Sequence, residues 1–110
     1  MLFLLLVHSA PDGEELDDPR GATEAWVSDV ESAGARIVGE RLVPSDEAMT
    51  LTIRGGEEFV VSGPADGRDD TIVGFDVLEC ASLDEALDAI MTHPMAVMGR
   101  LEIRAGMPFD

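Results

Sequence analysis

His8 is the side chain in this sequence best placed for acid–base chemistry. It follows an uninterrupted apolar run at residues 2–7, so we expect it at the end of an interior strand, where a sheet can open toward a cleft. An imidazole titrates near neutral pH and can serve as a general base. In that role His8 would need polar neighbours, and the candidates are Glu40, Ser62 and Asp70.

The second histidine, His93, directly precedes Pro94 at the expected end of a helix. The helix dipole favours a positive charge there, so we interpret His93 as a charged cap. A metal site built from both histidines with Asp66 or Asp70 has no support in their spacing. We therefore predict no metal and no cofactor.

Residues 62–70 form a polar segment, rich in Gly and Asp, between two expected strands. The segment lacks the alternating acids and the distal Glu of a calcium loop. Ser62 lacks the flanking glycines of a nucleophile elbow, and no Gly pattern in the sequence opens a helix to hold phosphate. We interpret the segment as a solvated connection, with an active-site loop as the alternative.

Cys80 is the only cysteine, which excludes a disulfide within the chain. Its neighbours Glu79 and Glu85 are acidic, and carboxylates raise the pKa of a thiol, which disfavours a nucleophilic role. We interpret Cys80 as a small buried residue.

The charge balance excludes one class of partner. The chain carries 23 Asp and Glu against 7 basic residues, all of them Arg, for a net charge of −16. A nucleic-acid partner is excluded because the binding of phosphates requires clustered cations. The acidity and the absence of lysine fit either a GC-rich coding bias or a salt-filled cytoplasm, and neither bears on function.

The apolar N-terminus is too short to cross a membrane, because a bilayer span needs about 20 apolar residues. It also lacks the basic region and the cleavage site of a secretion signal. We therefore expect an interior strand here, no membrane association and a cytoplasmic protein. With 110 residues, of which 45% are hydrophobic, the chain is expected to form one domain over residues 1–110.

Local signals mark two helices. Asp18-Pro19 is a typical helix start, and Gly34 is a typical left-handed helix end. One apolar stripe runs between them, formed by Ala22, Trp26, Val30 and Ala33. The second helix begins at Ser82 with an S-x-x-E capping box and is expected to end before Pro94. Its apolar face is formed by Leu83, Ala86, Leu87, Ile90 and Met91.

β-Prone runs surround these helices, and the expected strands cover residues 2–8, 36–43, 48–54, 57–61, 71–79 and 97–104. Gly55-Gly56 favours a tight hairpin between the third and fourth runs. Without that hairpin the order is βαββαβ, which predicts an α+β fold of the ferredoxin-like type.

Two helices can cover only one face of such a sheet. The other face is then apolar and uncovered, and a second copy of the chain is the simplest cover for it. The sequence therefore predicts a homodimer with the geometry of a dimeric α+β barrel.

Three stretches resemble the YCII-related, DGPF-type family. They are GARIVGERLVPS at residues 34–45, Ser62-Gly63-Pro64-Ala65 followed ten residues after Pro64 by Gly74-Phe75, and SLDEALDAIMTHPMAVMGRLEIR at residues 82–104. The resemblance keeps its order over nearly the whole chain. It implies a ferredoxin-like fold and a homodimer with a cleft near the sheet. Members of the family resemble small enzymes or ligand-binding accessory proteins, and some accompany sigma factors.

The chain departs from the family at its signature tetrapeptide, Asp-Gly-Pro-Phe. The acid position is Ser62 and the aromatic position is Ala65. A following acidic position falls on Gly67, while the next is kept as Asp70. A carboxylate that could act as a base or orient a ligand is therefore missing from the tetrapeptide.

The first helix also departs from the enzyme-like relatives, which carry a histidine there. This chain offers Trp26 and Ser28 instead. The predicted ligand site is formed by Ser62, Gly63, Pro64, Glu40 and Trp26. The predicted catalytic residues are His8, chosen by its position at the strand end, and Asp70, the acidic position that the resemblance keeps.

Three functions remain open. The first is a non-catalytic or degenerate family member, a homodimer that binds a small ligand or a partner protein, and the altered tetrapeptide favours it. The second is a small cleft enzyme with His8 as its base. The third is a structural or regulatory accessory domain that binds no ligand.

Overall fold

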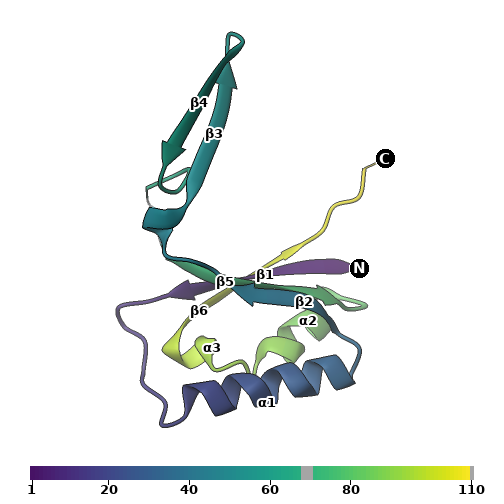
Figure 1. Ribbon diagram of the computed structural model, residues 1–110. Helices are drawn as coiled ribbons and strands as arrows, with labels where there is room; N and C mark the ends of the chain where they lie inside the picture. The colour runs from purple at the N-terminus through teal and green to yellow at the C-terminus, as the bar shows by residue number, and fades with distance from the viewer. Residues whose placement is uncertain (68–70, 110) are drawn as a thin grey trace.

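The chain forms a four-stranded antiparallel sheet with helices on one of its faces (Figure 1). A computed structural model describes residues 1–67 and 71–109. Its elements in chain order are β1 (Leu2–Ser9), α1 (Pro19–Ser32), β2 (Arg36–Arg41), the 3-10 helix η1 (Ser45–Glu47), β3 (Met49–Arg54), β4 (Glu57–Ser62), β5 (Ile72–Glu79), α2 (Leu83–Ile90), α3 (Met95–Met98) and β6 (Gly99–Ala105).

The strand order is β2-β5-β1-β6, and each neighbouring pair is antiparallel. β3 and β4 form a separate two-stranded sheet. This is the ferredoxin-like βαββαβ arrangement with an inserted hairpin, so the predicted fold is confirmed.

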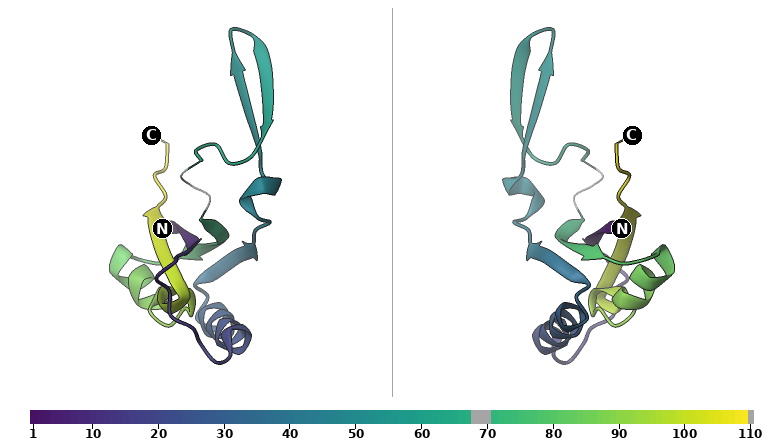
Figure 2. Two further views of the ribbon diagram at one scale, coloured as in Figure 1. Left: turned by 90° about the vertical axis from the view of Figure 1, so that its left-hand side faces the viewer. Right: turned by 90° about the vertical axis from the view of Figure 1, so that its right-hand side faces the viewer.

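The interior strand β1 has two different faces. Phe3, Leu5 and Val7 are buried, whereas the alternate residues Leu2 and Leu4 remain 51% and 38% exposed. The apolar run favoured burial on both faces, but the single chain buries only one, because its helices lie on one side of the sheet (Figure 2). On that side the core is completed by Trp26, Val30, Leu78, Ala86 and Ile90.

The caps predicted for the helices are present. The Asp18 carboxylate accepts a hydrogen bond from the Gly21 backbone N–H at the start of α1. The Ser82 hydroxyl accepts one from the Glu85 N–H at the start of α2. Gly34, with φ of 72°, takes the left-handed conformation after α1.

The second helix differs from the expectation. α2 ends at Ile90, and of its predicted apolar face only Ala86 and Ile90 are buried. Leu83, Leu87 and Met91 remain exposed. Pro94 precedes the one-turn helix α3, because a proline suits the start of a helix. The last strand, β6, therefore begins at Gly99, after α3.

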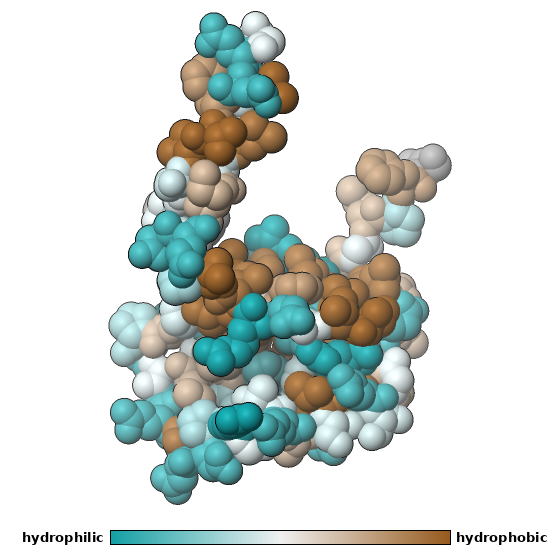
Figure 3. Space-filling view, in the orientation of Figure 1, coloured by the Kyte–Doolittle hydropathy of each residue, from teal (hydrophilic) through white to brown (hydrophobic). Residues whose placement is uncertain are grey.

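The hairpin β3–β4, here called the arm (residues 49–62), projects away from the body of the molecule on the side opposite the helices (Figures 1 and 2). Its tight turn uses Gly55 and Gly56, with φ of 59° and 82°. Exposed hydrophobic side chains run along it: Met49, Leu51, Ile53, Phe59, Val60 and Val61. Figure 3 shows hydrophobic surface on the arm and on the adjoining edge of the body.

Candidate functional site

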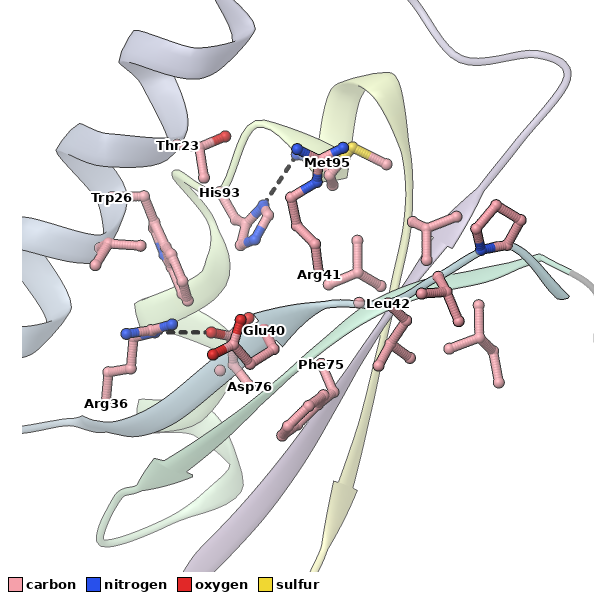
Figure 4. Close-up of a pocket in the computed structure, with 18 of the residues that line it drawn as sticks. Thr23, Trp26, Arg36, Glu40, Arg41, Leu42, Phe75, Asp76, His93 and Met95 are labelled. Atoms are coloured by element: carbon pink, nitrogen blue, oxygen red, sulfur yellow. Dashed lines mark hydrogen bonds and ion pairs between the residues drawn. The ribbon is translucent and has the colours of Figure 1, made fainter. Parts of the chain in front are cut away.

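An open cleft of about 760 Å³ lies on the helix-covered face of the sheet (Figure 4). Its walls come from α1, from β2 and the segment that follows it, from β5, and from the loop before α3. Two glycines on neighbouring strands allow close packing at its floor. A Cβ on Gly39 would collide with the Asp76 carboxylate, and one on Gly74 would come within 3.2 Å of the Glu40 carbonyl oxygen.

Arg36 and Asp76 form a buried ion pair at one end of the cleft. The Arg36 Nε donates to Asp76 Oδ1 over 2.8 Å, and its Nη1 donates to Glu31 Oε1 over 2.7 Å. Burial raises the pKa of Asp76, and the hydrogen bond from Arg36 offsets this only in part. The charges of Arg36 and Asp76 neutralise each other, so this end of the cleft offers no free charge to a ligand.

Trp26 and His93 form an aromatic wall. Their ring centroids lie 4.4 Å apart at an interplanar angle of 53°. The Trp26 indole N–H donates to the Ala89 carbonyl over 2.8 Å, which fixes the ring. The His93 Nδ1 accepts a hydrogen bond from the Met95 backbone N–H over 3.0 Å. An acceptor Nδ1 leaves the proton of a neutral imidazole on Nε2.

The interpretation of His93 as a charged helix cap is therefore wrong. The side chain is only 5% exposed, and burial lowers its pKa to about 4. Burial outweighs the helix dipole, since α2 already ends at Ile90 and His93 lies beyond its last turn. His93 instead accepts a hydrogen bond from the first turn of α3.

Arg41 supplies a free cation to the cleft. It ends β2 and pairs in register with Gly74, so it lies on the helix-covered face, and Figure 4 shows its side chain extending toward His93 and Met95. Within the part of the chain that the structure describes, no carboxylate forms an ion pair with Arg41.

A family model, the YCII-related domain, matches residues 1–110. The chain belongs to the YCII-related domain family. Over 48 residues it is 48% identical to an uncharacterized protein of Rhizobium meliloti; this match covers 44% of the YCII-related chain and 39% of that relative.

Among solved structures, the chain is similar to 5-chloro-2-hydroxyhydroquinone dehydrochlorinase (TftG) from Burkholderia phenoliruptrix AC1100, in complex with 2,5-dihydroxybenzoquinone. The TM-score is 0.51 at 16% identity, with 97% of this chain and 94% of that chain covered. At this identity the likeness supports the α+β fold of the YCII-related chain.

Two predicted ligand residues of this YCII-related chain, Trp26 and Glu40, line the cleft. The predicted base, His8, does not. It lies on the open face of the sheet, where its Nδ1 bonds the Thr71 hydroxyl over 2.7 Å and its Nε2 bonds Glu102 Oε1 over 2.9 Å. The carboxylate beside His8 is thus Glu102 and not Glu40.

The other predicted residues lie at the base of the arm. Ser62 ends β4 and its hydroxyl contacts the Met49 sulfur at 3.7 Å. The Gly63 N–H donates to the Ala48 carbonyl over 2.7 Å, and the Gly63 carbonyl accepts from the Thr50 hydroxyl over 2.8 Å. Pro64 follows them outside the cleft. Asp70 lies outside the described residues. The roles assigned to these residues stay predictions.

Sequence reasoning missed the Arg36–Asp76 pair. The available signal was a single acid, Asp76, inside the apolar run of β5. It also missed Arg41. Cys80 is buried as expected, and its pKa is raised by burial and then by Glu85 and Glu79.

A metal site and a membrane-spanning helix each have structural requirements. The described residues contain no group of three or more His, Cys, Asp or Glu side chains that could hold a metal ion. The described helices are also too short or too polar to cross a bilayer.

Proposed function

We propose that this YCII-related chain is a cytoplasmic homodimer that binds a small organic molecule in the cleft beside Trp26, as a non-catalytic or degenerate member of its family. The cleft carries the proposal, because about 760 Å³ lies within the usual range for small-molecule sites. A relative of the same fold, TftG, binds a small quinone, which supports a ligand of that size.

The side chains of the cleft favour binding over catalysis. Asp76 is held by Arg36, and the Nδ1 of His93 is occupied by the Met95 N–H. A general base needs an available lone pair and a pKa near the working pH, and His93, with a pKa of about 4, is only weakly basic. The replacement of the family's acid by Ser62 agrees with this reading.

The homodimer is supported by surfaces that a single chain leaves uncovered. Leu2 and Leu4 are exposed on the open face of the sheet, and the arm is exposed along its length. An isolated two-stranded hairpin is at best marginally stable in water, so the arm needs a surface to pack against. A second copy laid on the open face would cover both.

Ligand binding is tested by a thermal-shift screen of small organic molecules. A ligand at a hundred times its Kd stabilises the folded chain by about 2.7 kcal/mol, so hits raise the Tm. Thr23→Phe would block the cleft from α1 and should abolish these shifts. Ser28→Phe, on an exposed part of the same helix outside the cleft, is the matched control. Equal shifts in both variants would place the ligand elsewhere.

The second candidate is a small enzyme with His8 as its base. The observation in its favour is the chain of hydrogen bonds from Glu102 through His8 to the Thr71 hydroxyl, which orients an imidazole toward a hydroxyl. Such a histidine can take the hydroxyl proton while the oxygen attacks an ester carbonyl. The ester C–O bond then breaks, the alcohol leaves with that proton, and water releases the acyl group from Thr71 as the acid. Loss of 4-nitrophenyl acetate hydrolysis in His8→Ala and in Thr71→Val would support this candidate, and unchanged hydrolysis in both would exclude it.

A further inference from the structure

We propose that the ligand of the cleft is an organic monocarboxylate with an apolar body, and that Arg41 binds its carboxylate. This inference rests on the proposed function, since it names the chemical class that the same cleft would take.

The first argument is the pairing of the arginines. In a chain with 23 acidic and 7 basic residues, an arginine readily finds a carboxylate. Four described arginines do so, in the pairs Arg20–Glu24, Arg36–Asp76, Arg100–Asp12 and Arg104–Glu102. Arg54 lies at the tip of the arm, and Arg68 lies outside the described residues. Arg41 is thus the described arginine that faces the cleft without an ion pair.

The second argument is the space in front of Arg41. Its partner across the strands is Gly74, so no side chain from β5 fills the adjacent position. The guanidinium is planar and offers parallel N–H groups, which match the two oxygens of a carboxylate. An anion that entered from the mouth of the cleft could therefore meet Arg41 without displacing another side chain.

The third argument is the apolar wall beside this cation. Trp26 and His93 present their rings, and Val27, Ile72 and Met95 add aliphatic surface. His93 is neutral at physiological pH, so it adds no second positive charge. An apolar body would lie against this wall while its charged end reached Arg41.

The fourth argument limits the ligand to one negative charge. Arg36 is already neutralised by Asp76, so it offers no second cation. The other charged side chain that lines the cleft, Glu40, is acidic and offers no cation either. A dicarboxylate or a phosphate ester would have more negative charge than the cleft can neutralise.

The test compares carboxylates with their primary amides, which have nearly the same shape but no charge. The probes are benzoate, 2-naphthoate and octanoate, each beside its amide, at constant ionic strength. Binding is followed by the fluorescence of Trp26, the only tryptophan in a chain without tyrosine, and by calorimetry. We expect at least one carboxylate to bind about tenfold more tightly than its amide.

Arg41→Met keeps the length of the side chain and removes its charge. We expect it to weaken binding of that carboxylate about tenfold and to leave binding of the amide unchanged. Arg54→Met, at the tip of the arm, removes the same charge from the chain and should change neither affinity.

Any other result contradicts the proposal that the ligand is a monocarboxylate bound by Arg41. If amides bind as tightly as carboxylates, or if Arg41→Met and Arg54→Met weaken carboxylate binding equally, the ligand class is wrong while small-ligand binding stands. If no carboxylate and no amide binds, the inference fails, and the proposed function fails as well only if the thermal-shift screen also finds no ligand.

Discussion

The two faces of the sheet carry the same kind of residue in different surroundings. On β1, Phe3, Leu5 and Val7 are buried by the helices of the same chain, while Leu2 and Leu4, one step along the strand, face outward. The covered face also holds the cleft, with its neutralised Arg36–Asp76 pair. The open face holds His8 and Glu102. The contrast teaches that an apolar residue in this strand does not by itself show that its own chain buries it.

The largest effect is expected from an acidic residue placed on either face of β1. Leu5→Asp puts a charge into the core and should unfold the chain, at a cost of more than about 4 kcal/mol. Leu4→Asp should leave the fold intact and give a monomer, because that face would pack only against a second copy. Circular dichroism and light scattering measure the two outcomes. A wild-type chain that scatters as a monomer at micromolar concentration would contradict the homodimer.

A smaller effect is expected from the arm. Leu51 and Val60 are directly opposite each other on β3 and β4, and both are exposed. Replacing both with serine should weaken the dimer by about a hundredfold or more, because each buried aliphatic side chain contributes about 1.5–3 kcal/mol. Thr52→Ser, on the other face of the arm, is the control. Sedimentation equilibrium of the three proteins gives the dissociation constants, and unchanged values would mean that the arm packs elsewhere.

The covered face should show its own dependence on pH, through His93. Its pKa is about 4 in the folded chain against 6.5 for an ordinary histidine, so the unfolded chain binds the proton first. Stability is therefore full above pH 6.5 and falls as the pH drops toward 4, by at most about 3 kcal/mol. Urea unfolding across this range measures the loss.

His93→Asn isolates this contribution, because its amide oxygen can still accept from the Met95 N–H but does not titrate. The raised pKa of Asp76 has the opposite effect on stability and is present in both proteins, so it cancels in the difference. An equal loss of stability in wild type and His93→Asn would show that His93 is not the titrating group.

The smallest expected effect is that of salt on the Tm, and it concerns both faces of the sheet alike. A net charge of −16 destabilises the compact chain by self-repulsion. The screening length falls from about 10 Å at 0.1 M salt to about 3 Å at 1 M, so the Tm should rise over that range. A flat or falling Tm would mean that the carboxylates are already neutralised, by arginines or by bound cations.

The fold could be predicted because its signals are local. Asp18 and Ser82 cap their helices, and Gly55-Gly56 turns the hairpin, each within a few residues. The cleft could be predicted only in part, because its groups meet across the sheet. Arg36 and Asp76 are 40 residues apart, and His93 packs against the distant Trp26. Trp26 and Glu40 were found by resemblance to relatives, which carries information about such contacts that spacing lacks.

The central place of β1 in the sheet has a consequence for synthesis. Its neighbours are β5 and β6, with Leu2 opposite Glu79 and Phe3 opposite Ala105, so β1 pairs with strands that are synthesised much later. Until β5 and β6 have been synthesised, β1 is an apolar segment without strand partners. Long-range pairing of this kind slows folding and prolongs the exposure of aggregation-prone strands. During synthesis β1 therefore stays without its strand partners until the residues of β6 have been made.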